Sequence, residues 1–186
     1  MKHFINLKDI PSKDLRKILL DAKKRKKKRN KFNALQTDKD LPLKNKLLVQ
    51  MFEKSSLRTR LSFYLAIKQL GGGTLTLRSN ELHLGAGGES LEDTAKILST
   101  YGDGFMLRTD SDKKIGNFKN YLSIPLINGL SPSSHPTQVL SDVFTVEEIK
   151  KKPISKLNIC WIGDSNNVLN SLIATSVKFR FNLNIG

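Results

Sequence analysis

The sequence predicts an α/β fold in which a parallel sheet is flanked by helices. Short apolar runs alternate with longer segments in which apolar residues recur every three or four positions. These are the patterns of buried strands and of amphipathic helices, respectively. Strands joined through helices run parallel, and the helices cover the faces of the sheet. The expected strands are residues 47–52, 74–77, 105–107, 124–127, 157–162 and a last one from 183.

The helices are expected from their apolar faces and their capping residues. Ser12 is the predicted N-terminal cap of the first helix. Ser90, with Asp93 three residues later, resembles a capping box. The expected helices are residues 11–29, 57–70, 90–101, 112–121, 136–150 and 167–179.

The composition limits the class of protein. A chain of 186 residues, 38% of them hydrophobic, is long enough for one domain, or for one domain and part of another. Its single cysteine, Cys160, excludes a disulfide within the chain and fits a reducing compartment. The chain has neither an apolar run of membrane-spanning length nor an apolar signal segment at Met1–Asn6. We therefore expect a cytoplasmic protein.

The net charge of +15 is concentrated in part in a basic run, Lys23–Arg29. Such a run can bind nucleic acid or a membrane surface, or it can be the solvated end of a helix. No aromatic residue interleaves with the lysines, so stacking on bases is not indicated. Cations are also favoured in the last turns of a helix. The solvated helix end is the preferred interpretation, and a nucleic-acid partner is not expected.

The stretch Phe52–Arg60 joins a predicted strand to a predicted helix. The free backbone N–H groups and the dipole of a helix N-terminus favour an anion there. Ser56 and Thr59 add hydroxyl donors, and Arg58 adds a planar guanidinium that suits a phosphate. The alternative is an ordinary capped helix, but basic residues are disfavoured in a first turn. The stretch therefore predicts a phosphate site.

Further polar residues follow other predicted strands. Arg108 ends the strand 105–107, His135 opens the helix after the strand 124–127, and Asn166–Asn167 follow the strand 157–162. In parallel α/β folds, ligands bind beyond the carboxyl ends of the strands. His135 and Gln138 also share one helix face, so that imidazole and carboxamide can reach one small ligand. This set suits a phosphorylated substrate with a carbonyl group to polarise.

Other chemistries lack their motifs. The sequence contains no phosphate-binding P-loop, no Gly-x-Gly-x-x-Gly after a strand and no Gly-x-Ser-x-Gly. The three histidines are scattered and do not make a zinc site. We expect no metal and no cofactor.

Several of these motifs together resemble the aspartate and ornithine carbamoyltransferases. The turn Gly163-Asp164-Ser165-Asn166-Asn167 is similar to that of the ornithine enzymes in particular. The similarity covers essentially the whole chain, and its motifs are Ser56–Arg60, His135–Gln138, Phe52–Lys54, Glu89–Ala95, Arg108–Thr109, Ile127–Ser131 and Trp161–Asn167.

The resemblance implies transfer of the carbamoyl group of carbamoyl phosphate to the δ-amine of L-ornithine, which gives citrulline. It implies that carbamoyl phosphate contacts Ser56, Leu57, Arg58, Thr59, Arg108, His135 and Gln138. Within this set, Arg58, Thr59 and His135 would be catalytic, because they point at the carbonyl oxygen. Asn167 would bind ornithine. The family is typically homotrimeric, and His83 would lie in the loop that completes a neighbouring subunit's site.

This chain differs from the family pattern in three respects. Leu57 stands where the family usually has Thr, so one hydroxyl donor to phosphate is lost. The loop 85–90 is one residue longer than usual. Family members also have a second domain of similar size.

From that last difference we expect residues 1–150 to be the carbamoyl phosphate-binding domain. Residues 151–186 would be the first strand–helix–strand of a second Rossmann-like α/β domain, the ornithine-binding one. The chain as it stands would then bind carbamoyl phosphate with little or no transferase activity.

Two alternatives remain open on the sequence. One is aspartate carbamoyltransferase, or a relative with another acceptor. The other is a basic non-enzymatic module that binds nucleic acid through Lys23–Arg29.

Overall fold

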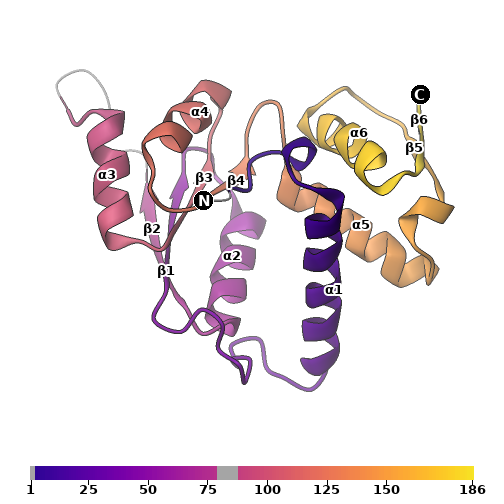
Figure 1. Ribbon diagram of the computed structural model, residues 1–186, viewed down its shortest axis with the longest axis horizontal. Helices are drawn as coiled ribbons and strands as arrows, with labels where there is room; N and C mark the ends of the chain where they lie inside the picture. Colours follow the sequence, from indigo (N-terminus) through magenta and orange to yellow (C-terminus); the bar gives the residue numbers. More distant parts are fainter. Residues whose placement is uncertain (1–2, 79–87) are drawn as a thin grey trace.

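The computed structural model of the protein, shown in Figure 1, describes residues 3–78 and 88–186. The larger of its two sheets has four parallel strands. Its strand order is β2-β1-β3-β4, and neighbouring strands are parallel. A separate two-stranded parallel sheet consists of β5 and β6. The predicted parallel α/β class is therefore confirmed. The strands are β1 (Leu47–Phe52), β2 (Gly73–Arg78), β3 (Gly104–Arg108), β4 (Leu126–Leu130), β5 (Asn158–Trp161) and β6 (Asn182–Ile185).

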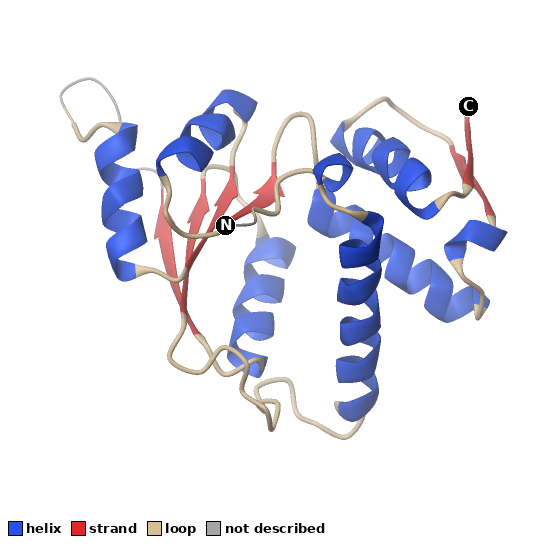
Figure 2. Ribbon diagram, viewed as in Figure 1, coloured by secondary structure: helices blue, strands red, loops and turns tan. Residues whose placement is uncertain are grey.

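Helices lie on both faces of the larger sheet (Figure 2). None of them, within the described part of the chain, is long and apolar enough to cross a membrane. The helices are η1 (Leu7–Asp9), α1 (Ser12–Lys28), α2 (Leu57–Gln69), α3 (Leu91–Tyr101), α4 (Asp112–Tyr121), α5 (Pro136–Lys150), η3 (Ile154–Lys156) and α6 (Asn167–Phe179).

One face of the sheet is covered by α3 and α4. Val49 and Met51 of β1 alternate toward these helices, as expected for a strand. Phe105 of β3 packs against Phe118 of α4, with ring centroids 5.1 Å apart and the ring planes tilted by 53°. Ser90 caps α3 as predicted, since its hydroxyl accepts a hydrogen bond from the Asp93 N–H at 3.0 Å. This cluster fixes β1 and β3, whose ends carry the candidate site residues.

The helix α2 lies against the other face, but none of its residues is fully buried. Three residues of the apolar repeat that predicts this helix remain exposed, namely Leu57, Leu61 and Tyr64 at 74%, 50% and 44% exposure. Leu75 of the edge strand β2 is also exposed, at 47%. An apolar surface therefore extends along α2, whereas Leu75, which pairs with Val49 of β1, lies on the opposite face of the sheet.

A second hydrophobic cluster joins α1, α5 and α6. It contains Leu15 and Leu19 of α1, Val139 of α5 and Phe179 of α6. Arg16 stacks its guanidinium over the Phe179 ring, 4.6 Å from the centroid. The expected domain boundary at residue 150 falls between α5 and η3, and this cluster contains residues from both sides of it.

Two local predictions are wrong. Ser12 is the first residue of α1 rather than its cap, because the Pro11 carbonyl accepts the N–H groups of Asp14 and Leu15 at 2.9 and 3.1 Å.

The strand predicted at 124–127 is shifted to Leu126–Leu130. Pro125 has no N–H to donate at the start of a strand. The pair Asn128-Gly129 suggests a turn but is paired, since the Asn128 N–H donates to the Phe4 carbonyl at 2.8 Å. Gly129 packs so closely against Met106 that a Cβ would lie 2.5 Å from its Sδ.

Candidate active site

The carboxyl ends of the parallel strands bring most of the predicted site residues to one edge of the sheet. The last residue of β1, Phe52, pairs with Arg108, the last residue of β3. Arg108 in turn pairs with Leu130 at the end of β4. The loop into α2, the Arg108 side chain and the loop into α5 therefore start from adjacent strand ends, as predicted.

The N-terminus of α2 has the features of an anion site. Ser56 is its N-cap, with extended backbone angles, but its hydroxyl makes no capping hydrogen bond. The first turn contains no acidic residue. Its N–H groups thus lack the side-chain acceptor that usually satisfies them, while the helix dipole favours a negative charge. Arg58, in this turn, is exposed.

Arg108 connects β3 to this turn. Its Nη1 donates to Thr59 Oγ1 at 3.2 Å. Its Nε is buried and has no hydrogen-bond partner among the described residues. Burial lowers the pKa of Arg108 from its ordinary value, yet a guanidinium stays protonated in proteins. A charged donor beside the N-terminus of α2 suits a bound oxyanion.

His135 is the N-cap of α5, before Pro136. Burial, and secondly the charge of Arg108, lower its pKa to about 4. The imidazole is therefore neutral at pH 7, with one nitrogen that donates and one that accepts. Its Nδ1 lies 3.4 Å from Thr137 Oγ1. The His135 backbone N–H donates to Ser171 Oγ of α6 at 2.9 Å, which fixes the start of α5.

Gln138 and Asn167 are held by protein groups. Gln138 Nε2 donates to Asp142 Oδ1 one turn along α5, at 2.8 Å, and burial raises the pKa of Asp142. Asn167 Nδ2 donates to the Ser131 carbonyl at 2.8 Å. Asn167 thus lies at the loop that leads from β4 to His135, while Gln138 is directed toward Asp142. The remaining predicted residue, His83, lies outside the described residues.

A clamp of three side chains supports the loop into α2. Glu53, whose side chain is only 10% exposed, accepts hydrogen bonds from Thr109 Oγ1 and from Lys114 Nζ. Its backbone N–H donates to the Arg108 carbonyl at 3.0 Å. Glu53, Thr109 and Lys114, called the Glu53 clamp below, therefore tie the loop after β1 to the turn after β3.

The sequence did not identify two features of the site, Ser171 and the Glu53 clamp. Ser171 falls one turn after Asn167 on α6, so helical spacing from Asn167 could have indicated it. The partners of Glu53 are 56 and 61 residues away in the chain, and no local pattern reports them. Among the described residues, no group of three or more His, Cys, Asp or Glu could hold a metal ion.

The chemistry of this edge is electrostatic. It offers backbone N–H groups, two guanidinium groups, hydroxyl groups and a neutral imidazole. Such donors stabilise a negative charge that develops on a substrate oxygen.

Residues 2–148 match the family model described as "Aspartate/ornithine carbamoyltransferase, carbamoyl-P binding domain". The chain belongs to the aspartate/ornithine carbamoyltransferase family. The ornithine carbamoyltransferase of Brucella ovis is 42% identical over 185 residues, covering 100% of this chain and 57% of that protein. The ornithine carbamoyltransferase of Mesorhizobium japonicum is 40% identical over 185 residues, covering 100% of this chain and 59% of that protein.

Solved structures agree with this family assignment. The anabolic ornithine carbamoyltransferase of Campylobacter jejuni is 38% identical, with a TM-score of 0.87 over 100% of this chain and 58% of that one. The catalytic subunit of the aspartate transcarbamoylase of M. jannaschii is 33% identical, with a TM-score of 0.82. The chain thus spans a little under three fifths of the length of the relatives that it matches.

Proposed function

We propose that this chain is the carbamoyl phosphate-binding part of an ornithine carbamoyltransferase. The observation that carries the proposal is the hydrogen bond between Arg108 and Thr59 beside the uncapped start of α2, with neutral His135 in the field of Arg108. Three separate strand ends thus contribute to one anion-binding edge. The names of the relatives supply the substrate class.

In this proposal the phosphate of carbamoyl phosphate binds at the N-terminus of α2. The backbone N–H groups of Ser56 and Leu57, with Arg58, Thr59 and Arg108, donate to its oxygens. Charge-assisted bonds from guanidinium groups are stronger than neutral ones. Leu57 contributes only its backbone, and its exposed side chain adds no donor.

Catalysis follows from donors aimed at the carbonyl oxygen. The neutral δ-amine of ornithine attacks the carbamoyl carbon, the C=O electron pair moves to oxygen, and a tetrahedral oxyanion forms. Arg58, Thr59 and neutral His135 stabilise that charge, which is greater in the transition state than in the substrate. The C=O bond then re-forms as the C–O bond to phosphate breaks, and the attacking nitrogen passes its proton to the departing phosphate. Gln138 turns from Asp142 to hold the carbamoyl amide.

Ornithine is the proposed acceptor, with Asn167 as a contact to its amino-acid end. The Asn166–Asn167 turn and the ornithine enzymes among the relatives support this choice. Aspartate is the second candidate, because the chain is also similar to an aspartate transcarbamoylase. We further propose that residues 1–150 are the carbamoyl phosphate domain, and that residues 151–186 begin the acceptor domain.

The assembly proposed is a homotrimer in which His83 reaches a neighbouring subunit's site. The apolar surface along α2, with Leu57, Leu61 and Tyr64 exposed, supports an interface close to the site. Burial of such side chains between subunits would stabilise the assembly. A cytoplasmic location remains part of the same proposal.

The proposal is tested by transferase assays on the chain extended to the length of its relatives. Citrulline should form with ornithine, and aspartate should give no carbamoyl product. The 186-residue chain alone should bind carbamoyl phosphate and form little or no citrulline. Transfer to aspartate in place of ornithine would refute the acceptor. Unchanged activity after Arg58→Ala would refute the site.

A further inference from the structure

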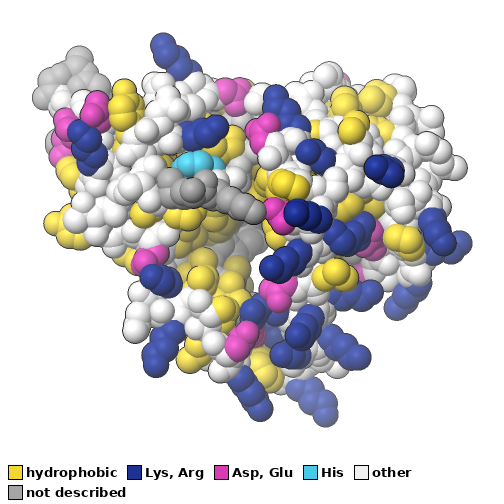
Figure 3. Space-filling model, viewed as in Figure 1, with side chains coloured by type: hydrophobic (Ala, Val, Ile, Leu, Met, Phe, Trp, Pro, Cys, Tyr) yellow, Lys and Arg dark blue, Asp and Glu magenta, His cyan; other side chains and the backbone are white. Residues whose placement is uncertain are grey.

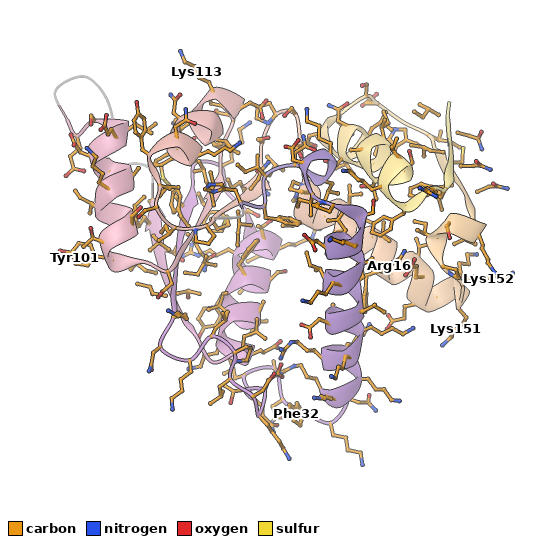
Figure 4. The ribbon with its side chains drawn as sticks, in the orientation of Figure 1. Arg16, Phe32, Tyr101, Lys113, Lys151 and Lys152 are labelled. Carbon is orange, nitrogen blue, oxygen red and sulfur yellow. The ribbon has the colours of Figure 1, made fainter. Side chains whose placement is uncertain are left out.

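A groove of about 670 Å³ lies between the ends of α1 and α5, away from the candidate active site. Figure 4 shows Lys151 and Lys152 at the end of α5, and Figure 3 shows Lys and Arg side chains gathered over the lower part of α1. Its lining includes five lysines, namely Lys23, Lys26, Lys27, Lys151 and Lys152. The groove therefore brings two basic runs of the sequence together.

The carboxylates of the groove pair with only one of these five lysines. Glu147 is held by Arg16 at 2.7 Å and accepts the Ile154 N–H at 2.9 Å. Glu148 pairs with Lys26 at 2.6 Å. Among the described residues, the other lysines of the lining (Lys23, Lys27, Lys151 and Lys152) have no carboxylate partner. Uncompensated positive charge thus faces one cavity.

The helix ends account for only part of this charge. Both α1 and α5 end at the groove, and a helix C-terminus carries a partial charge of about −0.5, which favours cations. Two such ends together offset about one elementary charge. Lys152 lies beyond the end of α5. The lysines that neither a carboxylate nor a helix end offsets therefore still repel one another. An anionic ligand would relieve that repulsion.

We propose that this groove binds a compact ligand that carries several phosphate groups, such as inorganic tripolyphosphate or a nucleoside triphosphate. Its volume is in the range of about 300–1,000 Å³ that is typical of small-ligand sites. Its lining contains no aromatic residue on which the bases of a nucleic acid could stack. These features favour a small polyphosphate over nucleic acid.

The proposed site is independent of the candidate active site. His135 caps the N-terminus of α5 and Lys151 caps its C-terminus. Helix α5 has 15 residues, so the two caps lie roughly 20 Å or more apart at about 1.5 Å per residue. No groove residue belongs to the carbamoyl phosphate site.

Calorimetric titration with tripolyphosphate, ATP and an RNA oligonucleotide tests the proposal. All variants carry Arg58→Ala, which weakens anion binding at the first site. The groove variant adds Lys27→Gln, Lys151→Gln and Lys152→Gln. The control adds Lys8→Gln, Lys44→Gln and Lys113→Gln, which removes the same charge elsewhere; Figure 4 shows Lys113 far from Lys151. Thermal melting checks that each variant is folded.

The groove substitutions should weaken tripolyphosphate binding about tenfold or more, and the control about threefold or less, because charge-assisted bonds are lost only in the first. ATP should respond in the same way. Equal affinity for both would identify the phosphate chain as the ligand, and tighter ATP binding would identify a nucleotide. Absence of binding, equal weakening by both variants, or tighter binding of the RNA would overturn the proposal.

Discussion

Substitution of Glu53 by Ala should destabilise the protein more than removal of an exposed ion pair. The Glu53 side chain is 10% exposed and accepts two hydrogen bonds, one from the fully buried Thr109. The substitution leaves the Thr109 hydroxyl without an acceptor and Lys114 without its counter-ion. Each lost bond to a charged group costs about 1.5–3 kcal/mol, but Lys114 is 31% exposed and water partly replaces its partner.

We therefore expect a loss of about 2–3 kcal/mol in the free energy of unfolding. For a chain of this length, that corresponds to a fall in Tm of roughly 4–12 °C. Urea denaturation followed by circular dichroism measures it. Glu92→Ala is the matched control, because Glu92 pairs with Lys96 on the surface of α3, where solvent screens the ion pair and its loss should change stability little.

The clamp also predicts an effect on the site. Glu53→Ala should raise the Kd for carbamoyl phosphate, since the loop into α2 is no longer held to the turn after Arg108. Glu53→Gln keeps an acceptor for Thr109 and should recover part of the stability. Equal destabilisation by Glu53→Ala and Glu92→Ala would refute this account of the clamp.

Three further predictions concern the site. His135 has a pKa of about 4 in the folded state and 6.5 in the unfolded state. Its contribution to the free energy of unfolding is therefore complete above pH 6.5 and is lost as the pH falls toward 4. His135→Gln should make the free energy of unfolding, measured by urea titration, depend less steeply on pH in this range. Leu57→Thr should tighten carbamoyl phosphate binding about three- to tenfold in calorimetry, because it adds a hydroxyl donor and removes only an exposed side chain. Ser171→Ala leaves the His135 N–H without its acceptor and should cost about 1–2 kcal/mol in unfolding free energy.

The sequence predicted the elements whose signals are local. Strand β1 and helices α3, α4 and α6 follow from apolar periodicity and capping residues, with bounds that agree with the structure to within a residue. The edge of the site followed from the rule that parallel strands end together. Strand β4 was misplaced, because Asn128-Gly129 has the local character of a turn but is paired with the N-terminal segment at Phe4.

The parts that could not be predicted depend on contacts distant in the chain. The apolar repeat of α2 indicates a helix, but periodicity does not tell whether another part of this chain covers it. Leu61 and Tyr64 remain exposed here. The bond of Ser171 to His135 joins residues 36 apart, and the neutral state of His135 arises from burial and Arg108. These features appear only when the elements are packed together.

The central claim is that carbamoyl phosphate binds at the N-terminus of α2. The most direct test is a titration of the isotope-labelled 186-residue chain with carbamoyl phosphate, followed through backbone amide NMR signals. We predict saturable shifts of the amides of residues 56–59 and of His135, and their loss in Arg58→Ala. Shifts confined to the lysine groove between α1 and α5, or no saturable shifts at residues 56–59, would contradict the proposed site.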